Sequence, residues 1–322
     1  MYWLSKKTSC RELPKTLYEG VIAFCLNRGC HSQKQSGGIK RLNEQLAAVA
    51  ASGYGAGSLD GLSSVAGEVF SDRVSIPSRA GGIDAAEVVR GRCARKAALL
   101  DDVSVLRLPP SEWEDPLPKA CHMISEEEEL LLFDRCLSSG FARLIPDSEV
   151  TRDEQGRQVV SGFFVVPHKA TSDRLTLDRR PDNARERRLE WVRLPSGACL
   201  AQFLLEPDEI IRVSGDDLRT YFYQLKKKSS GDGDVVGRAT DGEFLTKFGG
   251  VPGVKYRLKV QVWGMGDHNS CDVAQYVHET VLRSRRCMRP EEVIQWGSPL
   301  PEGPTAEGTY IDDHLVFQKV PT

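Results

Sequence analysis

The feature that most constrains the fold is an uninterrupted alternation of apolar and polar residues at positions 254–262. The apolar series is Val254, Tyr256, Leu258, Val260 and Val262, and the residues between them are Lys255, Arg257, Lys259 and Gln261. A period of two places the five apolar side chains on one face of an extended chain. The pattern therefore predicts a β-strand here.

Other segments carry helix and strand signals of their own. Ser125 is a good N-cap, glutamates at 126–129 suit a first helical turn, and Gly140 is a suitable helix end. Short apolar runs at 159–166 and 174–177 predict two strands around a polar loop. Valines at four-residue spacing predict a helix over 272–285, and two apolar runs over 309–317 predict a tight hairpin around Asp312-Asp313.

The N-terminal part reads differently. Residues 36–82 are dominated by Gly, Ala and Ser, with few large side chains to bury, although a short helix over 42–51 is compatible with the sequence. Such a segment does not easily offset its ordering entropy. We therefore expect a low-complexity, poorly ordered and flexible region over residues 1–120, with order beginning near Ser125, and a folded domain over residues 121–322.

Composition limits the class of protein. The 322 residues carry a net charge of −2, so binding to nucleic acid would depend on local basic patches. Two candidates are residues 169–193, with eight Lys/Arg against five Asp/Glu, and the lysines at 226–228. The nine cysteines are scattered and odd in number, and no run of about 18 apolar residues exists. We expect an intracellular protein, cytoplasmic or nuclear, that is not secreted and does not span a membrane.

Two acidic pairs are the candidates for chemistry. Asp312 and Asp313 lie at the predicted hairpin turn, where adjacent carboxylates repel unless a cation neutralises them. Asp216 and Asp217 follow an apolar run, and an aromatic-rich segment comes next, so one of them could face the hairpin within one sheet. Carboxylates from different strands are what a two-metal site requires. Alternatively, each pair is a solvated turn, which aspartate favours.

The order of motifs resembles that of reverse transcriptases, nearest to the gypsy-like class of LTR retrotransposons. Residues 217–225 resemble the first palm motif, and residues 265–270 followed by Gln275 resemble the second, a glycine turn that opens a helix. Tyr310-Ile311-Asp312-Asp313 is similar to the tyrosine-any-aspartate-aspartate signature. Upstream, residues 165–169 with Arg174 resemble the fingers hairpin, and residues 178–183 resemble a block that ends in asparagine.

This resemblance implies an α+β fold, with the fingers and palm of a right-handed polymerase and an antiparallel palm sheet. It implies an RNA-directed DNA polymerase that adds deoxynucleoside triphosphates to a primer on an RNA or DNA template. Only nine residues follow Asp313, so we expect a fragment that lacks the thumb and that shows little or no processive synthesis alone. The alternative is a catalytically inactive remnant that binds nucleic acid.

The resemblance also implies roles for single residues. Asp217 and Asp312 would be the principal ligands of two Mg²⁺ ions, with Mn²⁺ as a substitute, and Asp313 would be a weaker third carboxylate. Lys169 and Arg174 would bind the triphosphate, Phe222 would exclude a 2′-hydroxyl, and Gly266 would let the backbone approach the nucleotide. The alternatives are a solvated hairpin, a core aromatic and a plain turn glycine. If the motif is aligned one residue earlier, Asp216 takes the role of Asp217 and Tyr221 takes the role of Phe222.

Overall fold

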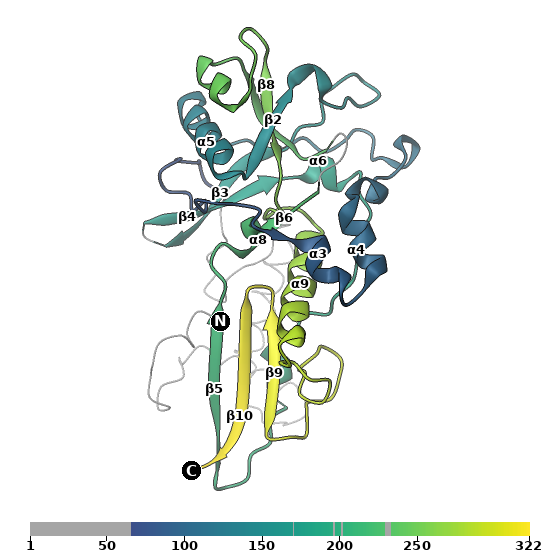
Figure 1. Cartoon of the computed structure of the whole chain (residues 1–322), viewed down its shortest axis with the longest axis vertical. Helices are drawn as coiled ribbons and strands as arrows, with labels where there is room; N and C mark the ends of the chain where they lie inside the picture. The colour runs from purple at the N-terminus through teal and green to yellow at the C-terminus, as the bar shows by residue number, and fades with distance from the viewer. Residues whose placement is uncertain (1–65, 170, 196, 201, 229–232) are drawn as a thin grey trace, which may run out of the picture.

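The computed structural model describes residues 66–169, 171–195, 197–200, 202–228 and 233–322, and the predicted helix at 42–51 lies outside them. The molecule is elongated, with a three-stranded sheet at one end and two smaller sheets with a helix at the other (Figure 1). It is a mixed helix and sheet protein whose longer strands pair antiparallel.

The predicted strand at 254–262 is β8 (Tyr256–Val260), the centre of a sheet of order β2-β8-β7. Its neighbours are β2 (Ala142–Pro146) and β7 (Val235–Thr240), both antiparallel to it. Tyr256, Leu258 and Val260 are buried as the alternation predicts, but Lys259 is buried as well. The second face of this sheet is covered too, because Val235, the register partner of Lys259, is buried in a small cluster with Ile145 and Val150.

A helix and a hairpin complete this half of the molecule. α5 (Glu126–Ser139) begins after Ser125, whose hydroxyl accepts from the Glu128 N–H at 3.2 Å, and it ends at Gly140 in the left-handed conformation. Both predicted helix ends are thus confirmed. The two predicted strands form a hairpin of β3 (Gly162–Lys169) and β4 (Ser172–Asp178), with an irregularity in pairing between Pro167 and Lys169.

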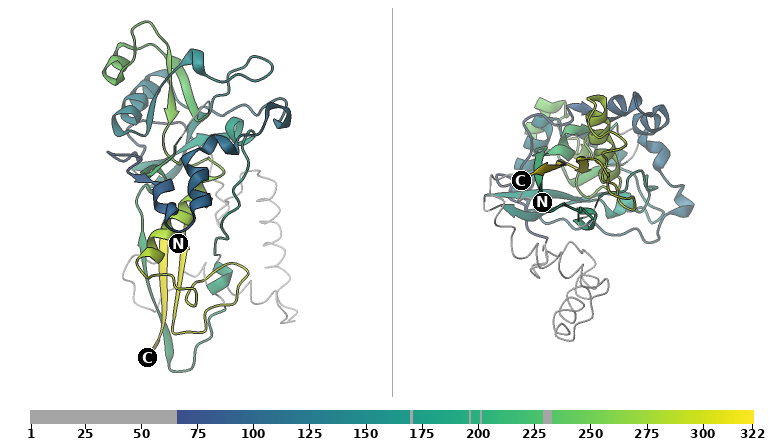
Figure 2. Two further views of the ribbon diagram at one scale, coloured as in Figure 1. Left: turned by 45° about the vertical axis from the view of Figure 1, so that its right-hand side comes forward. Right: turned by 90° about the horizontal axis from the view of Figure 1, so that it is seen from below.

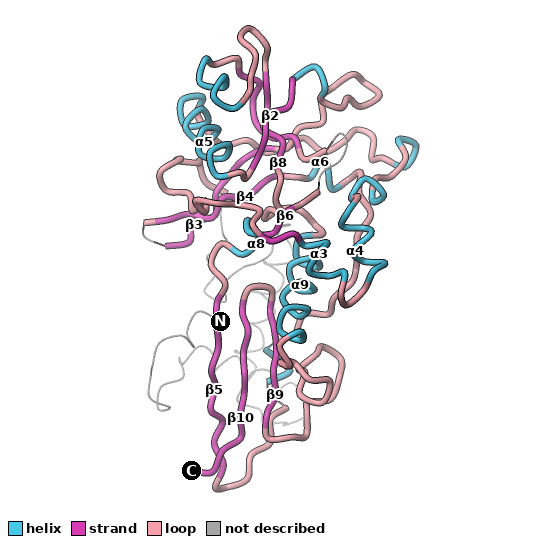
Figure 3. Tube along the Cα trace, in the orientation of Figure 1, coloured by secondary structure: helices cyan, strands magenta, loops and turns pink. Residues whose placement is uncertain are grey.

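The other end of the molecule is a sheet of order β5-β10-β9. The strands are β5 (Glu209–Asp217), β10 (Asp313–Pro321) and β9 (Thr305–Tyr310), all antiparallel to their neighbours. They are the longest magenta stretch of Figure 3. The predicted hairpin is therefore present, with strands longer than 309–317 and with Ile311 and Asp312 between them.

Residues 66–120 correct the sequence prediction, because order does not begin near Ser125. They include α3 (Ala85–Arg90) and α4 (Ala94–Asp101), and Asp84 caps α3 by accepting from the Glu87 N–H. Ala85, Val89 and Ala97 are buried in one core cluster with Trp263 and residues of α9. The small side chains of Ala85 and Ala97 allow these helices to pack closely.

α9 (Ser270–Ser284) is the predicted helix at 272–285, with two extra residues at its start. Val273 and Val277 are buried against α3, whereas Val281 is 44% exposed near the helix end. Figure 2 shows α9, in yellow-green, beside the blue helices α3 and α4 and directly above the sheet strands.

Two main cores meet near the middle of the molecule. One contains residues of α5, β3, β4 and β8, and the other contains residues of α3, α4 and α9. Phe222 packs against both of them. A third, smaller cluster of Cys199, Ile294, Ala306 and Phe317 covers one face of the long sheet.

The remaining described elements are short. They are β1 (Ile83–Asp84), which pairs parallel with β6 (Leu225–Lys226), and the helical turns α6 (Arg180–Asn183), α7 (Gly197–Leu200), α8 (Tyr221–Gln224), η1 (Val103–Leu106), η2 (Pro110–Glu112), η3 (Asp147–Glu149) and η4 (Glu243–Phe248). Among the described helices, none has the length and apolar character needed to cross a bilayer.

Candidate active site

The long sheet brings the two acidic segments together. Asp217, the last residue of β5, is the register partner of Asp313, the first residue of β10. The Leu218 N–H donates to the Asp312 carbonyl at 3.0 Å, which extends the pairing past the strand ends. Directly opposite residues in an antiparallel pair have Cα atoms about 4.5–5.5 Å apart. The two acidic segments, of which the sequence predicts that one could face the other within one sheet, therefore lie side by side in that sheet.

The pairing also distinguishes Asp217 from Asp216. Asp216 is opposite His314, so it belongs to the face of the sheet that carries the buried His314 and Thr309. Successive side chains of a strand point to opposite faces, so Asp217 and Asp313 share the other face. The charge of Asp217, rather than that of Asp216, acts on both Asp312 and Asp313. The geometry therefore favours the motif alignment in which Asp217, rather than Asp216, is the carboxylate beside the turn.

The turn between β9 and β10 is strained and held from α9. Ile311 has φ +59°, a left-handed conformation that is a genuine outlier for a β-branched residue. Its N–H donates to Oε1 of Gln275 at 2.7 Å, and its carbonyl accepts from Nδ1 of His278 at 2.8 Å. Nε2 of Gln275 also donates to the Thr309 carbonyl at 3.0 Å. Both backbone groups of the strained residue therefore have fixed partners on one helix.

Two aspartates of the turn are harder to ionise than usual. Burial raises the pKa of Asp312, and the negative charge of Asp217 raises it further, against an opposing effect of Arg174. Burial likewise raises the pKa of Asp313, with further contributions from Asp312 and Asp217. The three carboxylates thus repel one another, as closely placed acids without a counter-ion do.

Phe222 and Tyr221 differ in a way that bears on their roles. Tyr221 is buried, and its hydroxyl donates to the Ala274 carbonyl of α9 at 3.0 Å. Phe222 is half-buried at the junction of the two cores. Of these two residues, only Phe222 therefore keeps part of its ring accessible. This agrees with the motif alignment that begins at Asp217.

The structure places the two predicted phosphate-binding residues on the β3–β4 hairpin. Arg174 is exposed on β4, and its charge reaches Asp312. Lys169 is the last residue of β3, paired with Ser172, and its side chain lies outside the described part. Arg174 therefore lies close enough to influence Asp312, and the phosphate-binding roles of Arg174 and Lys169 both stay predictions.

Gly266 occupies a position that excludes any side chain. Its φ is +103°, and an added Cβ would lie 1.8 Å from the Leu177 carbonyl oxygen. The Met265 carbonyl accepts from the Leu177 N–H at 2.9 Å, and the Gly266 carbonyl accepts from Nδ2 of Asn183 at 2.9 Å. The glycine is thus required for packing of this turn against β4, whether or not a nucleotide approaches it.

A buried network of charges connects the motifs, and the sequence did not reveal it. Arg179, 2% exposed, pairs with Asp234 at 2.6 Å and with Asp267, and Lys227 pairs with the same two carboxylates at 2.7 and 2.8 Å. Burial disfavours the charged guanidinium, but the carboxylates outweigh it and hold the pKa of Arg179 well above its ordinary value. Arg107, Arg185, Asp182 and Glu186 extend the network.

This network corrects the two predicted basic patches. Within 169–193, Arg179 and Arg185 are buried with carboxylate partners, and Arg180 pairs with Asp178 at 2.6 Å. In the second patch, Lys227 is buried and Lys228 pairs with Asp84 and Asp101. Charge counts along the sequence overestimated the free positive charge, because they do not include partners from distant segments.

The aspartates have the right donor chemistry for Mg²⁺, which prefers carboxylate oxygens. Across the described residues, however, no group of three or more His, Cys, Asp or Glu side chains is arranged to hold a metal ion. Binding would therefore require the aspartate side chains to turn towards one another. A divalent cation would also relieve the repulsion that raises the pKa values of Asp312 and Asp313.

Comparisons with known proteins give loose structural likenesses only. No family model matches the chain, and no curated protein is significantly similar to it. One similar solved structure is a foamy viral protease-reverse transcriptase in complex with double-stranded DNA, with TM-score 0.37, 15% identity, and coverage of 71% of this chain and 35% of that one. Another is the native prototype foamy virus protease-reverse transcriptase, with TM-score 0.33, 12% identity, and coverage of 98% and 31%. This chain thus spans about a third of the length of those structures, and similarity at this level does not establish a shared function.

Proposed function

We propose that this chain contains the fingers and palm of an RNA-directed DNA polymerase from a retrotransposon-like element. In this proposal the β5-β10-β9 sheet with α9 is the palm, and the β3–β4 hairpin belongs to the fingers. The observation that carries the proposal is the pairing of Asp217 with Asp313 beside the Ile311-Asp312 turn. It joins two acidic segments that are far apart in sequence, at the place where the motif order requires them.

The carboxylates would hold the cofactor. Two Mg²⁺ ions, when bound, would activate the primer 3′-hydroxyl and stabilise the leaving pyrophosphate, and Mn²⁺ would be a substitute. Asp217 and Asp312 would be the shared ligands, and Asp313 would contribute a third carboxylate. The strained turn at Ile311, fixed by Gln275 and His278, would keep Asp312 in place while its side chain rotates.

The remaining residues would orient the deoxynucleoside triphosphate. Arg174, close enough to influence Asp312, would bind phosphate oxygens through charge-assisted hydrogen bonds. Lys169 would contribute a second positive charge from the same hairpin. Phe222, half-buried and five residues after Asp217, would contact the sugar and exclude a 2′-hydroxyl, and the turn backbone at Gly266, packed against Leu177, would approach the nucleotide.

Single-nucleotide incorporation tests the proposal directly. We would incubate the 322-residue chain in excess over a primer on an RNA template, with one complementary deoxynucleoside triphosphate and Mg²⁺. Addition of that nucleotide is expected, since one turnover requires less of the protein than processive synthesis does. Asp312→Asn should reduce the rate by on the order of a thousandfold or more, whereas the matched control Asp241→Asn, at an exposed turn position, should not.

The second candidate is a protein that binds nucleic acid without turnover. The observation in its favour is that no described group of acidic side chains is already arranged as a metal site. Template binding with no incorporation by the unaltered chain, at any Mg²⁺ or Mn²⁺ concentration, would favour this candidate. Incorporation that survives Asp312→Asn would contradict the polymerase assignment of the turn.

A further inference from the structure

A second cavity lies away from the carboxylates. Its volume is about 240 Å³, and residues of five segments line it: Arg92 and Lys96 at and before the start of α4, the stretch 191–195, α9, the stretch 288–295, and Thr309 of β9. Asp217, Asp312 and Asp313 are not among its lining residues. The cavity is therefore a separate candidate site, and its chemistry depends on other side chains.

The cavity carries an excess of positive charge. Arg92, Lys96, Arg193 and Arg283 line it, against one acid, Glu279. Glu279 is already engaged, since Arg92 pairs with it at 3.3 Å and Nε2 of Gln275 donates to it at 3.1 Å. Among the described residues no ion pair neutralises Lys96, Arg193 or Arg283. Three cations thus share one small cavity without an ion pair among the described residues, and the carboxylates of Glu279 and Asp272 act on Lys96 only from a greater distance.

Aromatic rings contact two of the four cations that line the cavity, Lys96 and Arg92. Nζ of Lys96 lies 3.7 Å from the ring centre of Tyr276 and 4.7 Å from that of Trp191. The guanidinium of Arg92 lies 4.3 Å from the ring centre of Tyr276. Ring faces attract cations without using their N–H donors in hydrogen bonds. The ammonium of Lys96 therefore keeps donors for a ligand.

The wall that carries Trp191 is fixed to α9. One carboxylate oxygen of Asp272 accepts from the N–H groups of Trp191 and Val192, at 2.6 and 3.0 Å. The rings of Trp191 and Tyr276 also meet edge to face, with centres 5.7 Å apart. A cavity held in this way needs little ordering when it binds a ligand.

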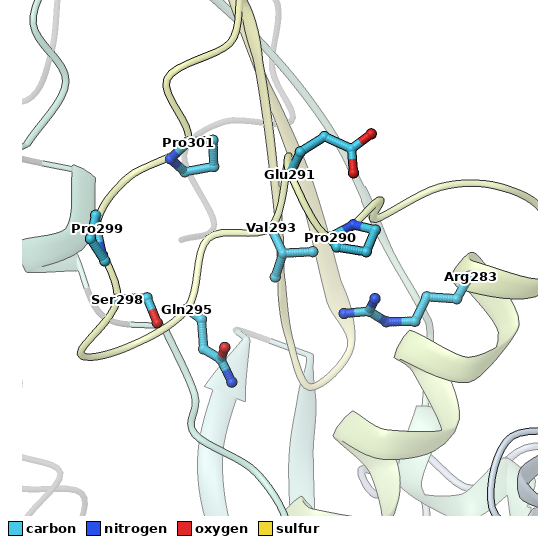
Figure 4. Close-up of a pocket in the computed structure, with 8 residues that line it drawn as sticks. All are labelled: Arg283, Pro290, Glu291, Val293, Gln295, Ser298, Pro299 and Pro301. Carbon is cyan, nitrogen blue, oxygen red and sulfur yellow. The ribbon is translucent and has the colours of Figure 1, made fainter.

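Arg283 lies between this cavity and a neighbouring one of about 310 Å³. Figure 4 shows its side chain extending from α9 towards Pro290 and Val293 of the neighbouring cavity. Its Nε atom is buried and has no hydrogen-bond partner. No acceptor in the described part of the chain therefore holds Nε of Arg283, and its burial leaves contact with a ligand to the other guanidinium nitrogens.

We propose that this pocket binds a small anion with two or more phosphate groups, of the size of inorganic diphosphate. Arginine guanidinium groups match phosphate oxygens with two parallel hydrogen bonds, and three uncompensated cations match a multiply charged anion. The volume is below the roughly 300–1,000 Å³ of sites for drug-sized ligands, which favours a compact anion. The proposal does not depend on polymerase activity.

Calorimetric titration with inorganic diphosphate tests this site. The buffer is kept at low salt and contains EDTA, so that no divalent cation can bridge diphosphate to the aspartates. The unaltered chain should bind, and the double variant Arg193→Gln/Arg283→Gln should bind at least about tenfold more weakly, as loss of charge-assisted contacts predicts. The matched double variant Arg188→Gln/Arg285→Gln, with both arginines exposed and outside the cavity, should bind normally.

Several outcomes would overturn the proposal. These are no binding by the unaltered chain, or equal loss in the two double variants. A third arm uses a single-stranded oligonucleotide as the ligand. If the pocket arginines affect oligonucleotide binding but not diphosphate binding, the recognised phosphates belong to a nucleic-acid strand and the small-anion assignment is wrong. Melting curves without ligand check folding, and Arg193→Gln alone, at an exposed position, keeps the test decisive if the double variant unfolds.

Discussion

Asp217 at the end of β5 lies directly opposite Asp313 at the start of β10, and the Leu218 N–H donates to the carbonyl of Asp312. Backbone pairing holds these acidic residues together. The sheet therefore stabilises an arrangement that the side-chain charges oppose. Such an arrangement is expected where a bound cation completes a site. The repulsion between the carboxylates can therefore be tested by substituting one of them.

The first prediction concerns stability against pH. The pKa values of Asp312 and Asp313 are raised by burial and by neighbouring carboxylates. Between the ordinary and the raised pKa the native state binds protons that the unfolded chain has released, so the free energy of unfolding falls as pH rises through this window. In EDTA at pH 7, Asp312→Asn should therefore raise Tm by a few degrees.

Thermal melting from pH 4 to pH 7 provides the measurement. The Asp312→Asn chain should also lose less stability over that range than the unaltered chain does. Asp241→Asn, at an exposed position, should change neither quantity. A lower Tm for Asp312→Asn would show that its carboxylate stabilises the fold, and that the repulsion is not the dominant effect.

The second prediction separates the two adjacent aspartates of β5. Asp217→Asn should reduce nucleotide incorporation by on the order of a thousandfold, because it removes a shared metal ligand in the proposed site. Asp216→Asn should have little effect, since Asp216 is on the face of His314. Single-turnover rates at saturating template measure both. The reverse result would shift the register by one residue and assign the sugar contact to Tyr221.

Local sequence patterns predicted the helices and strands of this chain where residues close together in sequence determine the structure. Ser125 and Gly140 marked both ends of α5, and the alternation at 254–262 marked β8. The hairpin and the acid at the end of β5 were also expected, because apolar runs and turn residues lie next to each other in sequence. These features depend on neighbours within a few positions.

Features that depend on distant partners were not predicted. Arg179 and Lys227 were counted as surface charge, but Asp234 and Asp267 neutralise them in the interior. Residues 66–120 were assigned to a flexible region because a stretch rich in Gly, Ala and Ser at 36–82 was extended to them, yet Val89 and Ala97 pack in a core with α9. No short-range signal specifies such contacts. His278 was missed too, although it lies three residues after Gln275 and could have been expected on the same helix face.

The third prediction concerns sugar selection. Phe222→Val should allow incorporation of ribonucleotides by removing a steric barrier, with a smaller effect on deoxynucleotide addition. The half-buried ring at the junction of the two cores motivates this change. The ratio of kcat/KM for the two sugars is the measurement, and Tyr223→Phe is the control in the same turn. An unchanged ratio would mean that Phe222 is only a core residue.

The fourth prediction concerns the buried charges. Arg179→Met should destabilise the chain by about 3–5 kcal/mol, because Asp234 and Asp267 would remain buried without this partner. Lys247→Met removes one partner of a surface ion pair with Asp134, in which both side chains are exposed (53% and 41%), and should cost about 0–1 kcal/mol. Chemical denaturation measures both. Similar losses for the two variants would mean that Lys227 alone can neutralise the cluster.

The last prediction concerns the support of the turn by α9. Gln275→Leu removes the acceptor of the Ile311 N–H and the donor to Thr309, so the strained turn should lose its fixed geometry. A displacement of about 1 Å at a reacting group can cost on the order of a hundredfold in rate. We therefore expect kcat to fall by that order while template affinity is unchanged, since Gln275 would not contact template. Gln275→Glu keeps the acceptor for Ile311 and should recover part of the rate. Equal loss of kcat and template affinity, with no recovery by glutamate, would indicate general unfolding of α9 rather than positioning of Asp312.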